Sequence, residues 1–106
     1  VERAVPALGA LRANLTALGL DAEVHRGDAR TFARNAVRDG RTYDLVFLDP
    51  PYSEAERIGR DLPLRELIAS GGRLVSESDR RAPLPIEIPI RFERRYGDTL
   101  IRIHGH

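Results

Sequence analysis

A short motif, Asp49-Pro50-Pro51-Tyr52, combines residue types that suit chemistry on an amino group. The Asp49 carboxylate and a backbone carbonyl such as that of Pro50 can accept hydrogen bonds from the two hydrogens of an exocyclic base amine. These bonds would favour a tetrahedral nitrogen and aim its lone pair at a methyl donor, and the prolines would hold both acceptors in place. Tyr52 offers a flat face for a base taken out of its stack. A rigid turn with a solvated Asp49 is the alternative interpretation.

The motif follows an apolar run, so we expect it at the carboxyl end of a buried strand. Leu45 to Leu48 supply the apolar residues, and the two prolines end the strand because neither has an N–H for the ladder. Ligands of open α/β sheets bind outside this end of the strands. The motif is therefore the first candidate for an active site.

The rest of the chain alternates between helical and strand-like patterns. Apolar residues at three- and four-residue steps, with Pro, Asp or Gly at the ends, predict helices over 5–18, 29–39 and 63–70. Short apolar or alternating runs predict strands over 20–25, 43–48, 73–76, 91–96 and 99–103. Residues 53–61 and the proline-rich 80–90 are predicted loops, and Gly97-Asp98 is a hairpin signal. We therefore expect one α/β domain with a mixed sheet.

The composition excludes several classes of protein. Of the 106 residues, 42% are hydrophobic and 31% are charged, which is typical of a globular domain rather than a disordered or membrane protein. The net charge of +1 gives no overall basic field for nucleic acid, although every one of the 17 basic residues is Arg. The absence of Cys is compatible with a reducing cytoplasm. The first residues do not form a signal peptide, and a start at Val1 makes us expect a piece of a longer protein.

Together, five segments resemble a class I, S-adenosylmethionine-dependent methyltransferase. Within that class the chain is most similar to the RsmD family, the small-subunit ribosomal RNA guanine-N2 methyltransferases. Asp49 to Tyr52 resembles the fourth motif of the amino-methylating members. The further likeness lies in Val1-Glu2-Arg3 with Leu11 to Leu15, Gly27-Asp28-Ala29, Gly71 to Val75, and Arg95 to Thr99.

The resemblance implies a role for each matching residue. Asp49, Pro50, Pro51 and Tyr52 would form the catalytic motif. The cofactor would be S-adenosylmethionine, and the partner would be ribosomal RNA or the small ribosomal subunit.

Three further residues would bind the cofactor. Glu2 would hydrogen-bond the ribose hydroxyls, and Asp28 would meet the adenine amino group with the Ala29 backbone nearby. Asp28 could equally be a plain N-cap of the helix that follows it. No metal is expected, since His104 and His106 lack a third ligand.

The implied fold is a Rossmann-like class I methyltransferase sheet with a C-terminal antiparallel hairpin. Residues 1–106 would be the C-terminal part of a single methyltransferase catalytic domain. The first strand and its Gly-rich loop are lacking, so we expect the fragment alone to be inactive and its sheet to be rearranged or completed by a partner. The alternatives are a DNA adenine-N6 methyltransferase and a non-catalytic binding module with a degenerate fold. Arg91, Arg94 and Arg95 could touch RNA phosphates or simply form a charged surface.

Overall fold

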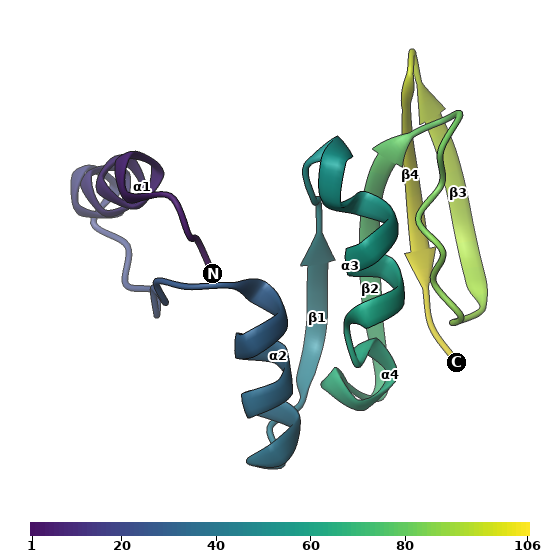
Figure 1. Cartoon of the computed structure of the whole chain (residues 1–106), viewed down its shortest axis with the longest axis horizontal. Coiled ribbons are helices and arrows are strands. Elements are labelled where there is room, and N and C mark those ends of the chain that lie inside the picture. Colours follow the sequence, from purple (N-terminus) through teal and green to yellow (C-terminus); the bar gives the residue numbers. More distant parts are fainter.

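The computed structural model shows a four-stranded mixed sheet with helices against one face (Figure 1). It describes the backbone of residues 1–106 and every side chain except that of Tyr52, and Gly59 is described only as part of its helix. The helices are α1 (Val5–Leu18), α2 (Ala29–Arg38), α3 (Ala55–Asp61) and α4 (Leu64–Leu67), with a 3-10 turn, η1 (Tyr52–Glu54). The strands are β1 (Tyr43–Leu48), β2 (Ile68–Asp79), β3 (Ile90–Tyr96) and β4 (Thr99–His104).

The order of the strands is β1-β2-β4-β3, with β1 at one edge and β3 at the other. β1 and β2 are parallel, with Val46 opposite Leu74, whereas β4 runs antiparallel to both β2 and β3. The turn between β3 and β4 uses Gly97, whose φ of 59° is in the left-handed region that favours glycine. This confirms the predicted hairpin.

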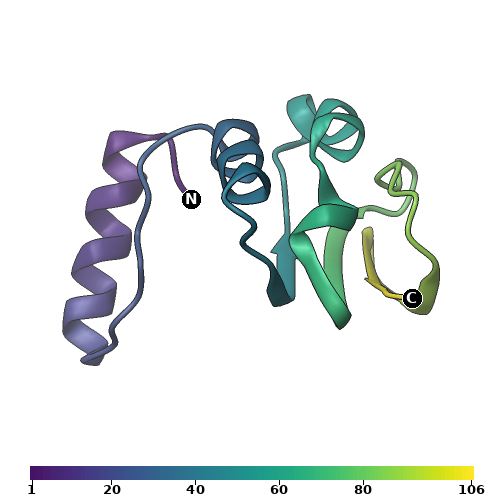
Figure 2. The same cartoon turned by 90° about the horizontal axis from the view of Figure 1, so that it is seen from below.

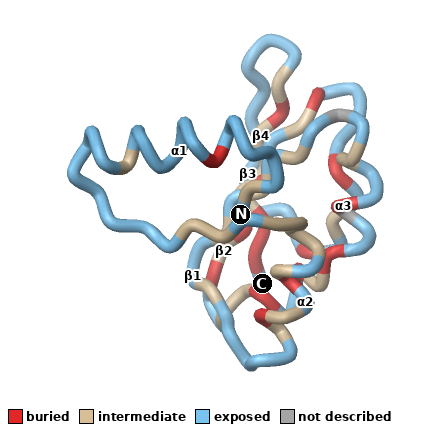
Figure 3. The backbone as a smooth tube through the Cα atoms, turned by 60° about the vertical axis from the view of Figure 1, so that its left-hand side comes forward, coloured by how far each residue is buried: buried red, intermediate tan, exposed pale blue. Residues whose placement is uncertain are grey.

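The helices α2, α3 and α4 cover a single face of the sheet (Figure 2). Their buried residues pack on Leu74 of β2 and on Val46 and Leu48 of β1. The core between these layers consists of Ala33, Ala36, Ile58, Leu62, Leu64, Leu67, Leu74 and Ile88. Most of the buried hydrophobic residues belong to this cluster, whereas Leu8, Leu84 and Leu100 are buried outside it (Figure 3).

The opposite face of the sheet is open. Leu45 and Phe47 of β1 point to this face and are 53% and 72% exposed, because side chains alternate along a strand and Val46 and Leu48 face the core. α1 stands to one side of the sheet (Figures 2 and 3), and Leu8 is its one buried residue among those described.

Two predicted helices are confirmed together with their end signals. In α1, Pro6 lies in the first turn and Gly19 ends the helix at φ 66°. In α2, Asp28 is the N-cap, and its side chain accepts a hydrogen bond from the Arg30 N–H. None of the helices among the described residues is long and apolar enough to cross a membrane.

The predicted strand at 20–25 is wrong. This segment has no strand structure, and the only pairing is an isolated parallel bridge between Glu2 and Arg26 among the residues that the structure describes. Two backbone bonds form it, from Glu2 N–H to the His25 carbonyl and from Gly27 N–H to the Glu2 carbonyl, both 3.0 Å long. A strand needs a ladder along its length and a buried face, and residues 20–25 have neither here.

The helices observed over residues 53–70 also differ from the prediction. The predicted loop at 53–61 contains α3, whose Ile58 and Leu62 are buried one turn apart. The predicted helix at 63–70 ends at Leu67 because Ile68 already pairs with Tyr43 of β1. The pairing of Ile68 with Tyr43, followed by the ladder that resumes at Arg73, therefore overrides the local helical pattern.

Candidate active site

Asp49 and Pro50 present two free acceptors at the carboxyl end of β1. Asp49 is exposed, and among the described residues no hydrogen bond or ion pair uses its carboxylate or the Pro50 carbonyl. The next carbonyl, that of Pro51, instead accepts from the Glu54 N–H at 3.0 Å and so begins η1. The chain thus turns sharply after leaving one carboxylate and one carbonyl open to a ligand.

Beside these acceptors lies a cavity of about 540 Å³ between β1, the start of α2 and the first residues of the chain. It brings together most of the residues that the sequence singled out. The lining includes Glu2, Asp28, Ala29, Asp49, Pro50 and Pro51. The side chain of Tyr52 lies outside the described residues. The roles given to all of these residues stay predictions.

Asp28 has a structural task as well as a place in the cavity. One carboxylate oxygen accepts from the Arg30 backbone N–H at 2.7 Å and from Arg30 Nε at 3.2 Å, and the other accepts from Arg30 Nη2 at 3.1 Å. The Arg30 side chain and backbone lower the pKa of Asp28 to about 2. The carboxylate therefore stays ionised and is fixed against the first turn of α2.

Glu2 is held in a similar way at the start of α1. Its Oε1 accepts from the backbone N–H groups of Arg3 and Ala4, both at 2.9 Å. These bonds, first that from Ala4 and then that from Arg3, lower the pKa of Glu2. Within the described part of the chain, Oε2 accepts no hydrogen bond and remains available.

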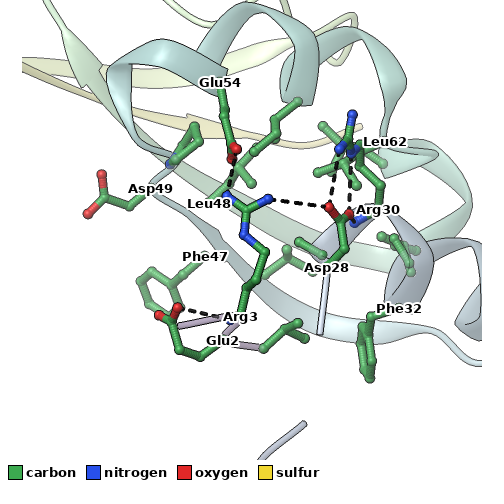
Figure 4. Close-up of a pocket in the computed structure, with 18 of the residues that line it drawn as sticks. Glu2, Arg3, Asp28, Arg30, Phe32, Phe47, Leu48, Asp49, Glu54 and Leu62 are labelled. Atoms are coloured by element: carbon green, nitrogen blue, oxygen red, sulfur yellow. Dashed lines mark hydrogen bonds and ion pairs between the residues drawn. The ribbon is translucent and has the colours of Figure 1, made fainter. Parts of the chain in front are cut away.

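Arg3 is the functional candidate that sequence reasoning missed. Its guanidinium extends between two carboxylates (Figure 4), donating from Nη2 to Glu54 Oε1 at 2.8 Å and placing Nη1 3.8 Å from Asp28 Oδ2. It thereby joins the first residues of the chain to η1, 51 positions away. Local sequence patterns cannot predict a contact over this separation. The position of Arg3 next to Glu2 was the only feature of the sequence that pointed to it.

Phe32 adds an aromatic wall to the cavity. Its ring lies 4.7 Å from the His25 ring, centroid to centroid, and the Arg41 guanidinium carbon lies 5.5 Å from its centroid. Phe32 lies on α2 and is half-buried.

The polar groups of the cavity fit the adenosine part of S-adenosylmethionine. A carboxylate offers about four acceptor positions; Asp28 accepts three hydrogen bonds from Arg30 and also interacts with the Thr31 backbone N–H, so an amino group would have to share an oxygen with one of these donors. The open Oε2 of Glu2 suits a hydroxyl donor. Four carboxylates, those of Glu2, Asp28, Asp49 and Glu54, line the cavity together with the guanidiniums of Arg3 and Arg30, so acids outnumber bases and the balance favours a cationic ligand.

The four-stranded mixed sheet follows the Rossmann-like class I methyltransferase fold, because solved structures of putative methyltransferases superpose on it. The family model described as Conserved hypothetical protein 95 matches residues 1–104. The chain therefore belongs to this family, the RsmD family.

Individual relatives agree with the family match. A putative rRNA methyltransferase of Bacillus subtilis, YlbH, is 32% identical over 98% of this chain. A hypothetical protein of Thermus thermophilus superposes over 98% of the chain with a TM-score of 0.85 at 23% identity. A putative methylase of Haemophilus influenzae superposes over 95% with a TM-score of 0.71 at 22% identity.

The chain spans 60% of YlbH, 59% of the T. thermophilus protein and 66% of the H. influenzae protein. The expected rearrangement of the sheet is not found, since the fold follows that of the T. thermophilus protein over nearly the whole chain; completion of the sheet by a partner stays a prediction.

Proposed function

We propose that residues 1–106 are the C-terminal part of a single catalytic domain that methylates the N2 amine of a guanine in small-subunit ribosomal RNA. The cofactor would be S-adenosylmethionine and the location the cytoplasm. The observation that carries the proposal is a pair of acceptors, the Asp49 carboxylate and the Pro50 carbonyl, which line the cavity and have no hydrogen-bond partner among the described residues. The putative rRNA methyltransferase activity in the name of YlbH supports ribosomal RNA as the substrate.

The two acceptors match the two hydrogens of an exocyclic amine. When they accept these hydrogens, the nitrogen lone pair leaves conjugation with the ring and becomes nucleophilic. Pro50 and Pro51 restrict the backbone, so the acceptors need little reorganisation during the reaction. When bound, S-adenosylmethionine supplies an electrophilic methyl group on its sulfonium. The amine gains that methyl group and loses one proton, and Asp49 is placed to receive it.

The cofactor would lie between the start of α1 and the start of α2. Glu2 would accept from the ribose hydroxyls and Asp28 from the adenine amino group, with the Ala29 backbone beside it. The Tyr52 ring would support the target base. Arg3 would keep Glu54 and Asp28 at a fixed separation while these ligands bind.

The test uses the complete native polypeptide with labelled S-adenosylmethionine, unmodified small ribosomal subunits and naked DNA. We expect label in the N2 amine of a ribosomal guanine, and a loss of roughly a hundredfold or more in Asp49→Ala. Glu66→Ala, which removes an equally exposed carboxylate on α4, is the matched control and should retain activity. Label in neither substrate would refute methyl transfer to nucleic acid. Label only in DNA adenine would replace the proposal with an adenine-N6 methyltransferase.

A further inference from the structure

A row of side chains with alternating charge links η1, the start of the chain, the start of α2 and the end of α3. In spatial order its members are Glu54, Arg3, Asp28, Arg30 and Asp61. The distances between the nitrogen and oxygen atoms of successive members are 2.8, 3.8, 3.1 and 4.0 Å. The first four members also line the cavity (Figure 4). Arg3 is the member that connects η1 to the rest of the row.

Glu54 is bound at both its side chain and its backbone. Its carboxylate accepts from Arg3 at 2.8 Å, and its N–H donates to the Pro51 carbonyl at 3.0 Å. Pro51 directly follows the two open acceptors, and its fixed φ leaves the backbone little freedom to absorb a movement of η1. A displacement of Glu54 would therefore be passed to the Asp49 and Pro50 acceptors.

The electrostatics of the row make Arg3 the residue that holds Glu54. The side chains of Glu54 and Asp28 are 29% and 30% exposed, so solvent screens their interactions with Arg3 less than those of a fully exposed pair. Among the ion pairs of the described residues, Glu54 has no partner other than Arg3. The nearby Arg30 is already bound to Asp28 by two hydrogen bonds from its side chain. Without Arg3, Glu54 would lose its cation and face the like charge of Asp28.

We propose that Arg3 is a positioning residue for methyl transfer. It holds Glu54 of η1 at a set separation from Asp28, and η1 in turn fixes the acceptors that precede it. The inference rests on the proposed function, because it takes Asp28 as a cofactor contact and the Asp49 and Pro50 oxygens as acceptors of the target amine. Loss of Arg3 should lower the rate of methyl transfer rather than the affinity for the cofactor, since misplaced acceptors act after both substrates are bound.

The test uses the complete native polypeptide in single-turnover reactions with labelled S-adenosylmethionine and unmodified small ribosomal subunits, both at saturation. Arg3→Ala should lower the rate of methyl transfer roughly tenfold or more. Its affinity for S-adenosylmethionine in calorimetry should not fall, because the change removes a cation from a cavity in which acids outnumber bases. Glu54→Ala should slow the reaction by a similar factor. The double variant should be no slower than the slower single variant, because both changes remove the same contact.

Arg60→Ala is the matched control. Arg60 forms an ion pair with Glu56 of the same length, 2.8 Å, and its side chain is 62% exposed, as is that of Arg3. This pair lies within α3, and Arg60 does not line the cavity beside Asp49. Arg60→Ala should therefore keep the parent rate. Amide hydrogen exchange without substrates gives a second readout, in which the Glu54 N–H should exchange faster in Arg3→Ala but not in Arg60→Ala.

The outcomes for the inference and for the proposed function are separate. Absence of methyl transfer by the parent would refute the proposed function, while the exchange measurement would still show whether Arg3 holds η1. The parent rate in Arg3→Ala, or unchanged exchange at Glu54, would overturn the inference and leave the proposed function intact. Weaker cofactor binding in Arg3→Ala, with the parent rate restored at saturation, would also overturn it, because Arg3 would then be a cofactor contact.

Discussion

The buried pair formed by Ser76 and His104 should be a measurable source of stability. His104 is 1% exposed and Ser76 3% exposed. The Ser76 hydroxyl and His104 Nε2 are 3.0 Å apart, and His104 Nδ1 is 3.1 Å from the Ile88 carbonyl oxygen. Because a carbonyl can only accept, Nδ1 carries the proton, and Nε2 accepts from the Ser76 hydroxyl. The neutral His104 ring thus forms one hydrogen bond with the Ser76 hydroxyl and one with the Ile88 carbonyl.

Replacing His104 with Leu leaves the Ser76 hydroxyl and the Ile88 carbonyl without a partner inside the core. Each unpaired buried group costs about 1–3 kcal/mol, so we expect the free energy of unfolding to fall by about 2–5 kcal/mol. Ser76→Ala leaves only Nε2 unpaired and should cost about 1–2 kcal/mol. In the double variant only the Ile88 carbonyl lacks a partner, so its cost should be below the sum of the two single costs by about 2–5 kcal/mol.

Urea unfolding followed by circular dichroism measures all four proteins of this cycle. The pH dependence provides a second readout. Burial lowers the pKa of His104 below its ordinary 6.5, so the unfolded chain binds the proton more readily than the folded one. The contribution to stability is therefore complete above about pH 6.5 and is lost as the pH falls below it, by at most about 1.4 kcal/mol per pH unit. His104→Leu should lack this component, and strictly additive costs with an unchanged pH profile would refute the reasoning.

The remaining predictions concern the β1–β2 junction and the isolated fragment. Gly72→Ala should lower the free energy of unfolding by about 1–3 kcal/mol, because a Cβ there would lie 2.9 Å from the Ala69 carbonyl oxygen and 3.0 Å from that of Asp44. Gly9→Ala meets nothing within 4 Å and should raise it by about 1 kcal/mol in the same urea titration, and a loss of stability there would contradict the assignment of an open site in α1. Residues 1–106 alone should bind S-adenosylmethionine weakly and transfer no methyl group. Leu45 and Phe47 of the cavity wall are exposed to solvent, so they leave this side of the cavity open to water. Tight stoichiometric binding in calorimetry would contradict this prediction.

Local chemistry was enough to predict the parts of the fold that depend on neighbours in the sequence. The prolines after Leu48 end β1, Asp28 caps α2, and Gly97 closes the hairpin. Each of these outcomes follows from the conformational limits of one or two residues. The acceptors of the candidate site could also be predicted from local sequence, since Asp49 and the two prolines occupy consecutive positions.

Features that depend on distant partners could not be predicted. Residues 20–25 alternate like a strand but find no ladder, whereas Ile68 leaves a helical pattern because Tyr43 pairs with it. Arg3 reaches Glu54 only after the sheet and η1 have formed. Alternation and spacing describe one segment at a time, so they cannot report which segment supplies the missing partner.

Within residues 1–106, β1 lies at the sheet edge, and this position has a consequence for the behaviour of the isolated fragment in solution. Its six residues, Tyr43 to Leu48, contain one charge and neither Gly nor Pro, and they leave a row of backbone groups unpaired on one side. Such a segment is a template for association with a strand from another molecule. Pro50 and Pro51 cannot join a ladder, so they limit the length of strand that a second molecule could extend. In residues 1–106 taken alone, the prolines next to the open acceptors would therefore also limit association between molecules.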